Sequence, residues 1–314
     1  MRCASVTPFH GEPRRAPTLI LTGDDFGASQ RANAAIIRAH TDGVLTAASL
    51  MVTGSAVVEA VVLARAHPGL RVGLHLVLVD GRSALEPDRL PGLVDKDRAF
   101  ARSPFRQGVR YGLVRGARAR LAGEIRAQFE RFAATKLALD HVDGHHHLHM
   151  HPVAWPLVVA EAERFGAAGV RITRDDLGLT LRWNRRGMLA RTAHAGVLGR
   201  LARHCRGRLE GRGLRCLDRT YGVVQPGGMT EAYLLWLVEH LPPSDAEIVF
   251  HPGAGAEDHS GGGTDPETQA LMSAKVRSAI AERGFRLGGY AELIGAGPEA
   301  RPRPPDQPSS NPSR

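Results

Sequence analysis

Short apolar runs alternate along this chain with segments in which apolar residues recur at helical spacing. Apolar runs of about 4–8 residues bounded by turn residues are typical of buried strands. The third run, RVGLHLVLV, is apolar on both faces, as expected of a parallel strand covered by helices on both sides. The pattern predicts strands at 18–23, 45–52, 71–79, 138–142, 169–173 and 247–250, and a short last element near 286–294.

Helical spacing fills the intervals between most of these runs. Ser29 is suited to cap the first helix and Gly43 follows its end, while Pro68 closes the second. Strand–helix alternation with short connections implies a parallel sheet with right-handed crossovers. We therefore predict an α/β fold, an irregular (β/α) barrel rather than an open sheet. The predicted helices are 29–39, 55–67, 117–134, 153–166, 230–240 and 266–283.

Two stretches interrupt the alternation, and both chain ends differ from the rest in composition. Residues 81–115 lose clear periodicity, and residues 177–220 form a second interruption. We interpret both as insertions in one domain that spans 18–296. The first 17 residues are expected to form a flexible N-terminus, and the Pro-rich tail, 297–314, to be disordered.

Composition indicates a globular protein of a reducing compartment. The chain has three cysteines, which show neither metal-ligand spacing nor an even-numbered disulfide framework. The start of the chain lacks the apolar segment of a signal peptide, and no apolar run approaches the roughly 20 residues that span a bilayer. We expect a cytoplasmic protein.

The net charge of +9 comes from arginine, and the arginines cluster in the two insertions. No acidic residue lies between Asp97 and Glu124, or between Asp176 and Glu210. In the second stretch apolar residues recur at helical spacing from Leu189 to Leu209 among arginines. This pattern predicts a basic amphipathic helix near 187–209. Such a helix either packs on the barrel or lies on an anionic membrane. In the second case the protein would be peripheral at the inner face of the membrane. Basic stretches poor in aromatic residues, without a base-reading motif, argue against nucleic acid.

Carboxylates and imidazoles stand where the predicted strands stop. Asp24 and Asp25 follow the first strand, His75 lies in the third, and His251 follows EIVF. The fourth strand leads into HVDGHHHLHMH, in which His145 comes first after Asp143-Gly144. In a parallel α/β fold the carboxyl ends of the strands meet at one rim, so these groups are expected to converge. The roles of His146, His147, His149 and His151 stay open.

One carboxylate and two imidazoles form a set of three ligands that leaves positions for water and substrate, as in hydrolytic metal sites. Two adjacent carboxylates can also take different roles, in which one binds the cation and the other accepts a proton. A histidine beside the Pro-Gly exit of a strand suits a general acid or an oxyanion partner. Mg²⁺, Zn²⁺, Mn²⁺ and Fe²⁺ are all compatible, and we expect Mg²⁺ with Zn²⁺ as the alternative.

Taken together and in order, these motifs resemble the YdjC family of carbohydrate deacetylases. The matching stretches cover most of residues 18–295 and include LILTGDDFG, VGLHLVLVDGR, LDHVDGHHHLHMHP and EIVFHPG. VGLHLVLVDGR and the segment from DRTYGVV to EIVFHPG further resemble the hopanoid-biosynthesis branch, HpnK. The stretch GHHHLHMH is closer to the chitooligosaccharide branch.

The resemblance implies an irregular (β/α) barrel of the glycoside hydrolase/deacetylase type. It makes Asp25, His75 and His145 the metal ligands, Asp24 the general base and His251 a candidate acid. It also implies removal of the acetyl group from an N-acetylglucosamine group carried by a hopanoid lipid. The alternatives are a deacetylase of soluble chitooligosaccharides and another metal hydrolase such as a phosphoesterase.

Overall fold

A parallel sheet forms the centre of the computed structural model, which describes residues 15–209, 211–225, 228–253 and 265–293. All pairings between its strands are parallel, in the order β5-β4-β3-β2-β1-β7-β6, with β8 also paired to β1. The strands are β1 (Thr18–Phe26), β2 (Ala47–Leu50), β3 (Arg71–Leu76), β4 (His141–Gly144), β5 (Gly169–Val170), β6 (Thr220–Tyr221), β7 (Ala246–Phe250) and β8 (Arg286–Leu287).

The sheet curls until its two edge strands approach each other. In β5, the Val170 N–H donates to the carbonyl of Arg215, which precedes β6, at 2.8 Å. In β6, the Thr220 N–H donates to the carbonyl of Arg174, which follows β5, at 3.0 Å. These isolated hydrogen bonds replace a full strand pairing at the seam. The prediction of an irregular (β/α) barrel is confirmed.

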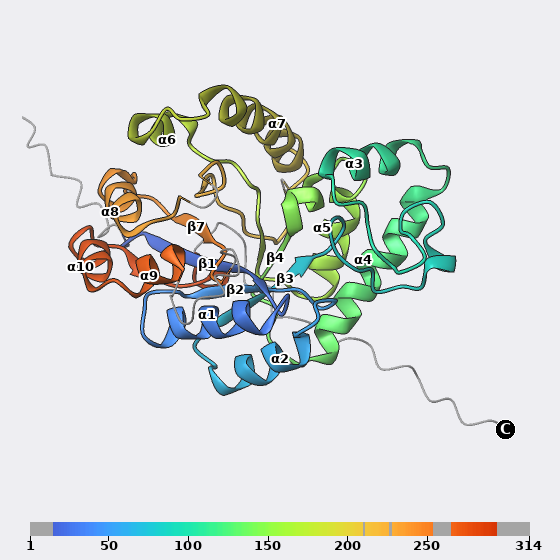
Figure 1. Cartoon of the computed structure of the whole chain (residues 1–314), viewed down its shortest axis with the longest axis horizontal. Coiled ribbons are helices and arrows are strands. Elements are labelled where there is room, and N and C mark those ends of the chain that lie inside the picture. Colours follow the sequence, from blue (N-terminus) through green and yellow to red (C-terminus); the bar gives the residue numbers. More distant parts are fainter. Residues whose placement is uncertain (1–14, 210, 226–227, 254–264, 294–314) are drawn as a thin grey trace, which may run out of the picture.

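Helices pack around this sheet as predicted, with one correction (Figure 1). Ser29 caps α1 by accepting from the Ala32 N–H at 3.1 Å. The single helix predicted over 266–283 is wrong, because Ser273 ends one helix in an extended conformation and its side chain caps the next. The surrounding helices are α1 (Gln30–Thr41), α2 (Val57–Ala66), α4 (Ala117–Ala134), α5 (Trp155–Arg164), α8 (Glu231–His240), α9 (Pro266–Met272) and α10 (Ala274–Glu282).

Strand boundaries differ from the predictions mainly where the chain nears the rim. The first strand continues through Asp24, Asp25 and Phe26. The fourth strand was expected at 138–142, but β4 begins only at His141 and includes Asp143. Strand β6 was not predicted, because two residues are too short to show a period.

The first insertion contains the 3₁₀ turn η1 (Pro87–Arg89) and helix α3 (Pro104–Leu113), which the sequence pattern did not predict. Buried side chains anchor it to the barrel. The Glu124 carboxylate of α4 accepts the N–H groups of Ala84 and Leu85 at 2.7 and 2.9 Å, and the Tyr111 hydroxyl donates to the carbonyl of Leu78.

The second insertion contains α6 (Leu177–Trp183) and α7 (Met188–Arg206). Helix α7 begins where the predicted basic helix does, but its last turns pack on the barrel. Leu198, Ala202 and Cys205 are buried, and the Trp155 indole donates to the carbonyl of Cys205 at 3.1 Å. Only the first half of α7 is therefore exposed on its apolar side.

The predicted flexible N-terminus lies outside the described residues except for 15–17, and the predicted disordered tail lies wholly outside them. Within the described residues, the helices are all too short or too polar to cross a bilayer.

Replacement of Glu124 by Ala is expected to lower the free energy of unfolding by about 2–4 kcal/mol, because one buried and one partly buried N–H group lose their acceptor. Urea denaturation followed by circular dichroism measures the change. Glu130→Ala on the exposed side of the same helix is the matched control and should change stability by less than about 0.5 kcal/mol. Equal effects of the two substitutions would contradict the anchoring role.

Candidate active site

A β-bulge at the end of β1 places two neighbouring carboxylates at the same site. The pairing of β1 with β2 shifts register between Gly23 and Phe26, and Asp25 has a φ of 64°. Successive side chains of a regular strand point to opposite faces, so this irregularity lets both aspartates reach the rim. A left-handed backbone at a non-glycine residue costs free energy and is often found at functional sites.

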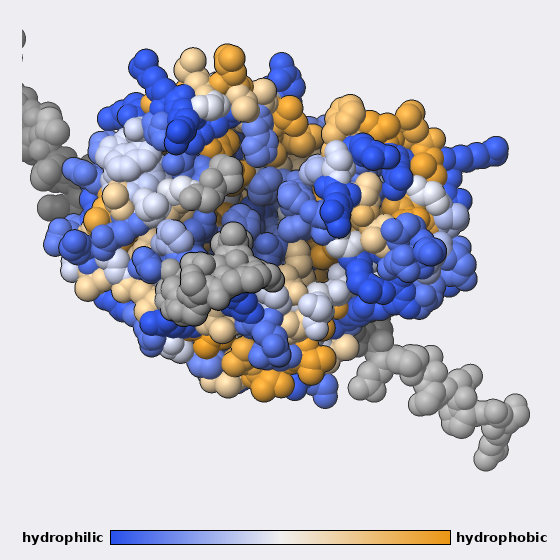
Figure 2. All heavy atoms as spheres, viewed as in Figure 1, coloured by the Kyte–Doolittle hydropathy of each residue, from blue (hydrophilic) through white to orange (hydrophobic). Residues whose placement is uncertain are grey.

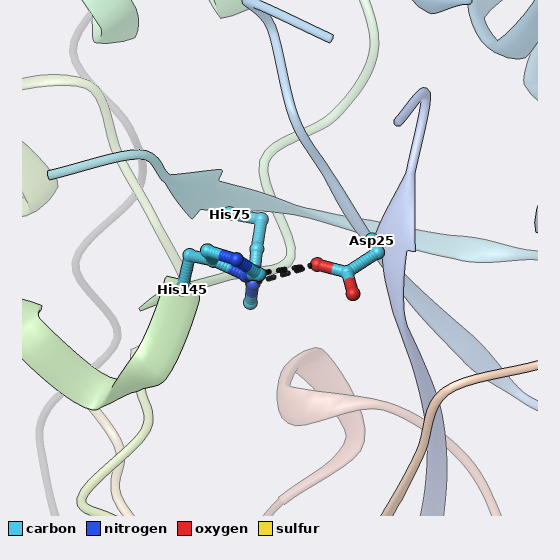
Figure 3. A group of neighbouring side chains, drawn as sticks. All are labelled: Asp25, His75 and His145. Carbon is cyan, nitrogen blue, oxygen red and sulfur yellow. Dashed lines mark ion pairs between the residues drawn. The ribbon is translucent and has the colours of Figure 1, made fainter. Parts of the chain in front are cut away.

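The structure brings Asp25, His75 and His145 together at the rim. Potential ligand atoms of the three residues lie within 4.8 Å of one another. Asp25 Oδ1 is 3.4 Å from His75 Nε2 and 3.1 Å from His145 Nδ1, and the three side chains point toward one another from β1, β3 and the start of η2 (His145–Met150) (Figure 3). Strand ends far apart in sequence thus converge as expected.

Asp143 orients one of these imidazoles. Its Oδ1 accepts a hydrogen bond from His75 Nδ1 at 2.8 Å, which turns His75 Nε2 toward the Asp25 carboxylate. Asp25 Oδ1 is buried and has no hydrogen-bond partner among the described residues. A positive charge between His75 Nε2 and this carboxylate is favourable, either a proton on the ring or a metal ion in its place, so the three residues fit a metal ion.

The charges around the site favour a cation. Burial by itself lowers the pKa of His75, but Asp143, Asp24 and Asp25 raise it overall to about 9. Burial likewise would raise the pKa of Asp25, but the contact with His145 and the charges of His75, His145 and His251 lower it overall. A field that holds positive charge on His75 also attracts a metal cation.

Two other groups of side chains have metal-ligand spacing in the described part of the chain, and both fit less well. Asp24, His75 and Asp143 are buried, but Arg171 already pairs with both carboxylates. Asp80 and His146, which share His145, are exposed to solvent and pair with each other at 3.5 Å. The Asp25, His75 and His145 group alone combines burial with an unpartnered carboxylate oxygen.

Arg171 is the residue of this site that the sequence pattern did not single out. It is fully buried just after β5, and its Nη1 and Nη2 donate to both oxygens of Asp24 at 2.8 and 3.0 Å. It also pairs with Asp143 and with Glu247, which accepts the Tyr290 hydroxyl at 2.8 Å. An arginine in the predicted strand GVRIT was the available signal, because a buried charge needs partners.

The other histidines of the HHHLHMH segment have separate partners. His149 is buried and donates from Nε2 to the carbonyl of Arg171 at 2.9 Å. His147 Nδ1 lies 3.2 Å from the Thr173 hydroxyl, and His151 Nδ1 accepts the Val153 N–H at 3.2 Å. Burial lowers the pKa of His149 to about 4, so its ring stays neutral. Of these three histidines only His149 is fully buried, whereas His147 and His151 also line the cavity.

His251 lines the same cavity as the candidate metal ligands. Its backbone N–H donates to Glu267 at 2.6 Å, while its side chain is exposed and lines the same cavity as Asp24 and Asp25. Glu267 was not among the predicted site residues. Burial raises the pKa of its carboxyl group despite the hydrogen bond from His251.

The cavity has a volume of about 1340 Å³, and its outer walls are largely apolar. The candidate metal ligands stand at its floor. Its sides come from α3, through Phe105 and Val109, and from α7, through Ala193, Val197 and Leu201. The two insertions therefore build the approach to the rim.

Comparison with known proteins agrees with the motifs. The family model of YdjC-like proteins matches residues 18–282. The chain belongs to the YdjC-like family. Among relatives of this YdjC-like chain, a carbohydrate deacetylase of Brevibacillus brevis is 42% identical over 47% of this chain and 56% of its own length, so the match spans about half of that relative.

Other relatives match from end to end. A chitooligosaccharide deacetylase of Serratia marcescens is 29% identical, and one of Salmonella paratyphi B is 30% identical, each over 88% of this chain and 98% of the relative. A solved structure from Enterococcus faecalis, described as a candidate cellobiose-phosphate cleavage protein, superimposes with a TM-score of 0.64 at 23% identity, over 88% of this chain and 98% of that one. At that identity the likeness shows the fold alone.

Asp143→Asn is expected to weaken divalent-cation binding about 10- to 100-fold, because a neutral amide is a weaker acceptor than the carboxylate that fixes the His75 ring. Titration calorimetry with Mg²⁺ and with Zn²⁺ measures the affinity. Asp80→Asn is the matched control, since Asp80 belongs to the exposed alternative group. Weaker binding by Asp80→Asn with unchanged binding by Asp143→Asn would move the ion to that group.

Proposed function

We propose that this YdjC-like protein is a metal-dependent hydrolase that removes the acetyl group from an N-acetylglucosamine group. The carrying observation is the carboxylate of Asp25 facing two imidazoles at the floor of a large cavity, beside a second, arginine-bound carboxylate. The named carbohydrate and chitooligosaccharide deacetylases among its relatives support the same activity.

Asp25, His75 and His145 would hold the ion, which we propose to be Mg²⁺ with Zn²⁺ as the alternative. A bound divalent cation lowers the pKa of water and polarises the acetamide carbonyl. The residues themselves set the geometry: Asp143 fixes the His75 ring, and the bulge at Asp25 aims its carboxylate at both imidazoles.

Asp24 is proposed as the general base. Arg171 donates to both of its oxygens and so holds the carboxylate in one orientation, while Asp24 still lines the cavity. It would accept the proton of the attacking water. His251, which lines the same cavity, would protonate the departing amine, and its backbone N–H donates to Glu267. The products are acetate and a free amino sugar.

We propose that the sugar is carried by a hopanoid lipid. The supporting observation is the apolar wall above the metal ligands, formed by Phe105, Val109, Val197 and Leu201. A free chitooligosaccharide presents hydroxyl groups, which gain little from such a wall. The relatives named as chitooligosaccharide deacetylases favour that soluble substrate as the second candidate. We also propose a cytoplasmic enzyme, peripheral at the inner face of the membrane.

Asp24→Asn is expected to lower kcat about 10²- to 10⁴-fold, because the amide cannot accept the proton, while metal affinity stays within a few-fold of the original. Asp25→Ala should abolish metal binding and activity together. Acetate release and calorimetry measure the two properties separately. Full turnover by the metal-stripped protein in excess chelator would refute the metal-dependent mechanism.

Substrate class is tested by incubating the protein with N-acetylglucosaminyl-hopanoid, with chitobiose and with a panel of phosphate esters. We expect acetate from the hopanoid substrate at a higher kcat/KM than from chitobiose, because only the lipid fills the apolar cavity. Preference for chitobiose would assign the soluble substrate instead. Phosphate release without acetate release would make the protein a phosphoesterase.

A further inference from the structure

Two helices from separate insertions flank the mouth of the cavity with matching apolar ridges. On α3 the ridge is Phe105, Val109 and Leu113, and on α7 it is Leu189, Ala193 and Val197. Both follow the i, i+4, i+8 spacing that places side chains on one face of a helix. Figure 2 shows hydrophobic side chains over both helices, on either side of a hollow.

These ridges continue from the cavity wall to the outer surface. Phe105, Val109, Ala193 and Val197 line the cavity, whereas Leu113 and Leu189 lie beyond it. Leu113 is 80% exposed and Leu189 is 82% exposed. Of the ten exposed large hydrophobic residues in the described part of the chain, seven belong to the two insertions. Single exposed apolar residues are normally scattered over a protein surface, so a concentration of them on two neighbouring insertions indicates a contact surface.

The positive charge around the ridges favours an anionic partner. The two insertions hold the long acid-free stretches of the sequence, and their arginines stand next to the apolar residues. Among the described residues, no carboxylate pairs with the exposed guanidinium groups that flank the two helices, those of Arg102, Arg106, Arg185 and Arg186. Apolar side chains mixed with unpaired arginines match the acyl boundary and headgroups of an anionic bilayer.

We propose that α3 and α7 together form a bilayer-docking face that seats the protein on an anionic lipid surface with its cavity open to the membrane. The sequence predicted membrane contact through one basic helix near 187–209, whereas this face combines helices from both insertions. The apolar side of the second half of α7 packs on the barrel, so the contact uses the first half of α7 and the whole ridge of α3. Nucleic acid would match the arginines but would gain nothing from the leucines.

This face deepens the proposed function, since it would deliver a lipid-borne sugar to the metal ligands, but it makes a separate prediction. The full chain should sediment with phosphatidylcholine vesicles that contain phosphatidylglycerol, and should stay in the supernatant with pure phosphatidylcholine. Raising the salt concentration should weaken the binding several-fold, because the arginine contribution is screened.

Leu113→Ser/Leu189→Ser is expected to weaken vesicle binding about 10- to 100-fold, since two large apolar side chains no longer enter the bilayer. Neither residue lines the cavity, so acetate release from a soluble N-acetylated sugar should be unchanged. The matched control is Val58→Ser/Val62→Ser on α2, where the two valines are 77% and 60% exposed. That variant should bind vesicles like the original protein.

A second variant, Arg185→Ser/Arg186→Ser, should lower binding to the anionic vesicles about tenfold and reduce its salt dependence. Equal recovery in the supernatant with and without anionic vesicles would overturn the proposal. So would equal losses in the α2 control, or a dimer that Leu113→Ser/Leu189→Ser dissociates without any vesicle binding. Because sedimentation does not depend on turnover, a failure of docking is distinguishable from a failure of the deacetylase proposal.

Discussion

The buried guanidinium of Arg171 holds the interior of the barrel together at the level of the active site. It binds Asp24 of β1, Asp143 of β4 and Glu247 of β7 while it stands at the end of β5. Removing charges from water is costly, and only multiple well-placed partners offset that cost. The position of the proposed base and of the acceptor that orients His75 therefore depends on one side chain.

The same cluster explains why the rim suits a cation. Its carboxylates outnumber the guanidinium, and Asp25 adds a further carboxylate whose buried oxygen lacks a hydrogen-bond partner among the described residues. Asp143 contacts both groups, because it pairs with Arg171 and also accepts the hydrogen bond that orients His75. The barrel supplies a rigid, negatively charged floor, and the insertions supply apolar walls. Chemistry and access thus come from different parts of the chain.

The sequence predicted much of this arrangement from local patterns. The alternation of apolar runs and helical segments predicted the parallel α/β barrel, and the family comparison agrees with the resemblance of the motifs. Asp24, Asp25, His75 and His145 were expected at one rim because the carboxyl ends of parallel strands meet there. Helix α3 was missed although its start carries local signals, namely Ser103 as the N-cap residue and Pro104 at the first helical position.

By itself, the sequence determined which residues lie at or near the carboxyl ends of the strands, because side-chain period and turn residues are local properties. Only the tertiary structure decided which of those residues touch. The partners of Arg171, the separate contacts of the histidines after Asp143, and the burial of the apolar side of the second half of α7 all arise between segments far apart in the chain. Such contacts depend on how the strands are ordered in space, and the spacing of residues along one segment carries no information about that order.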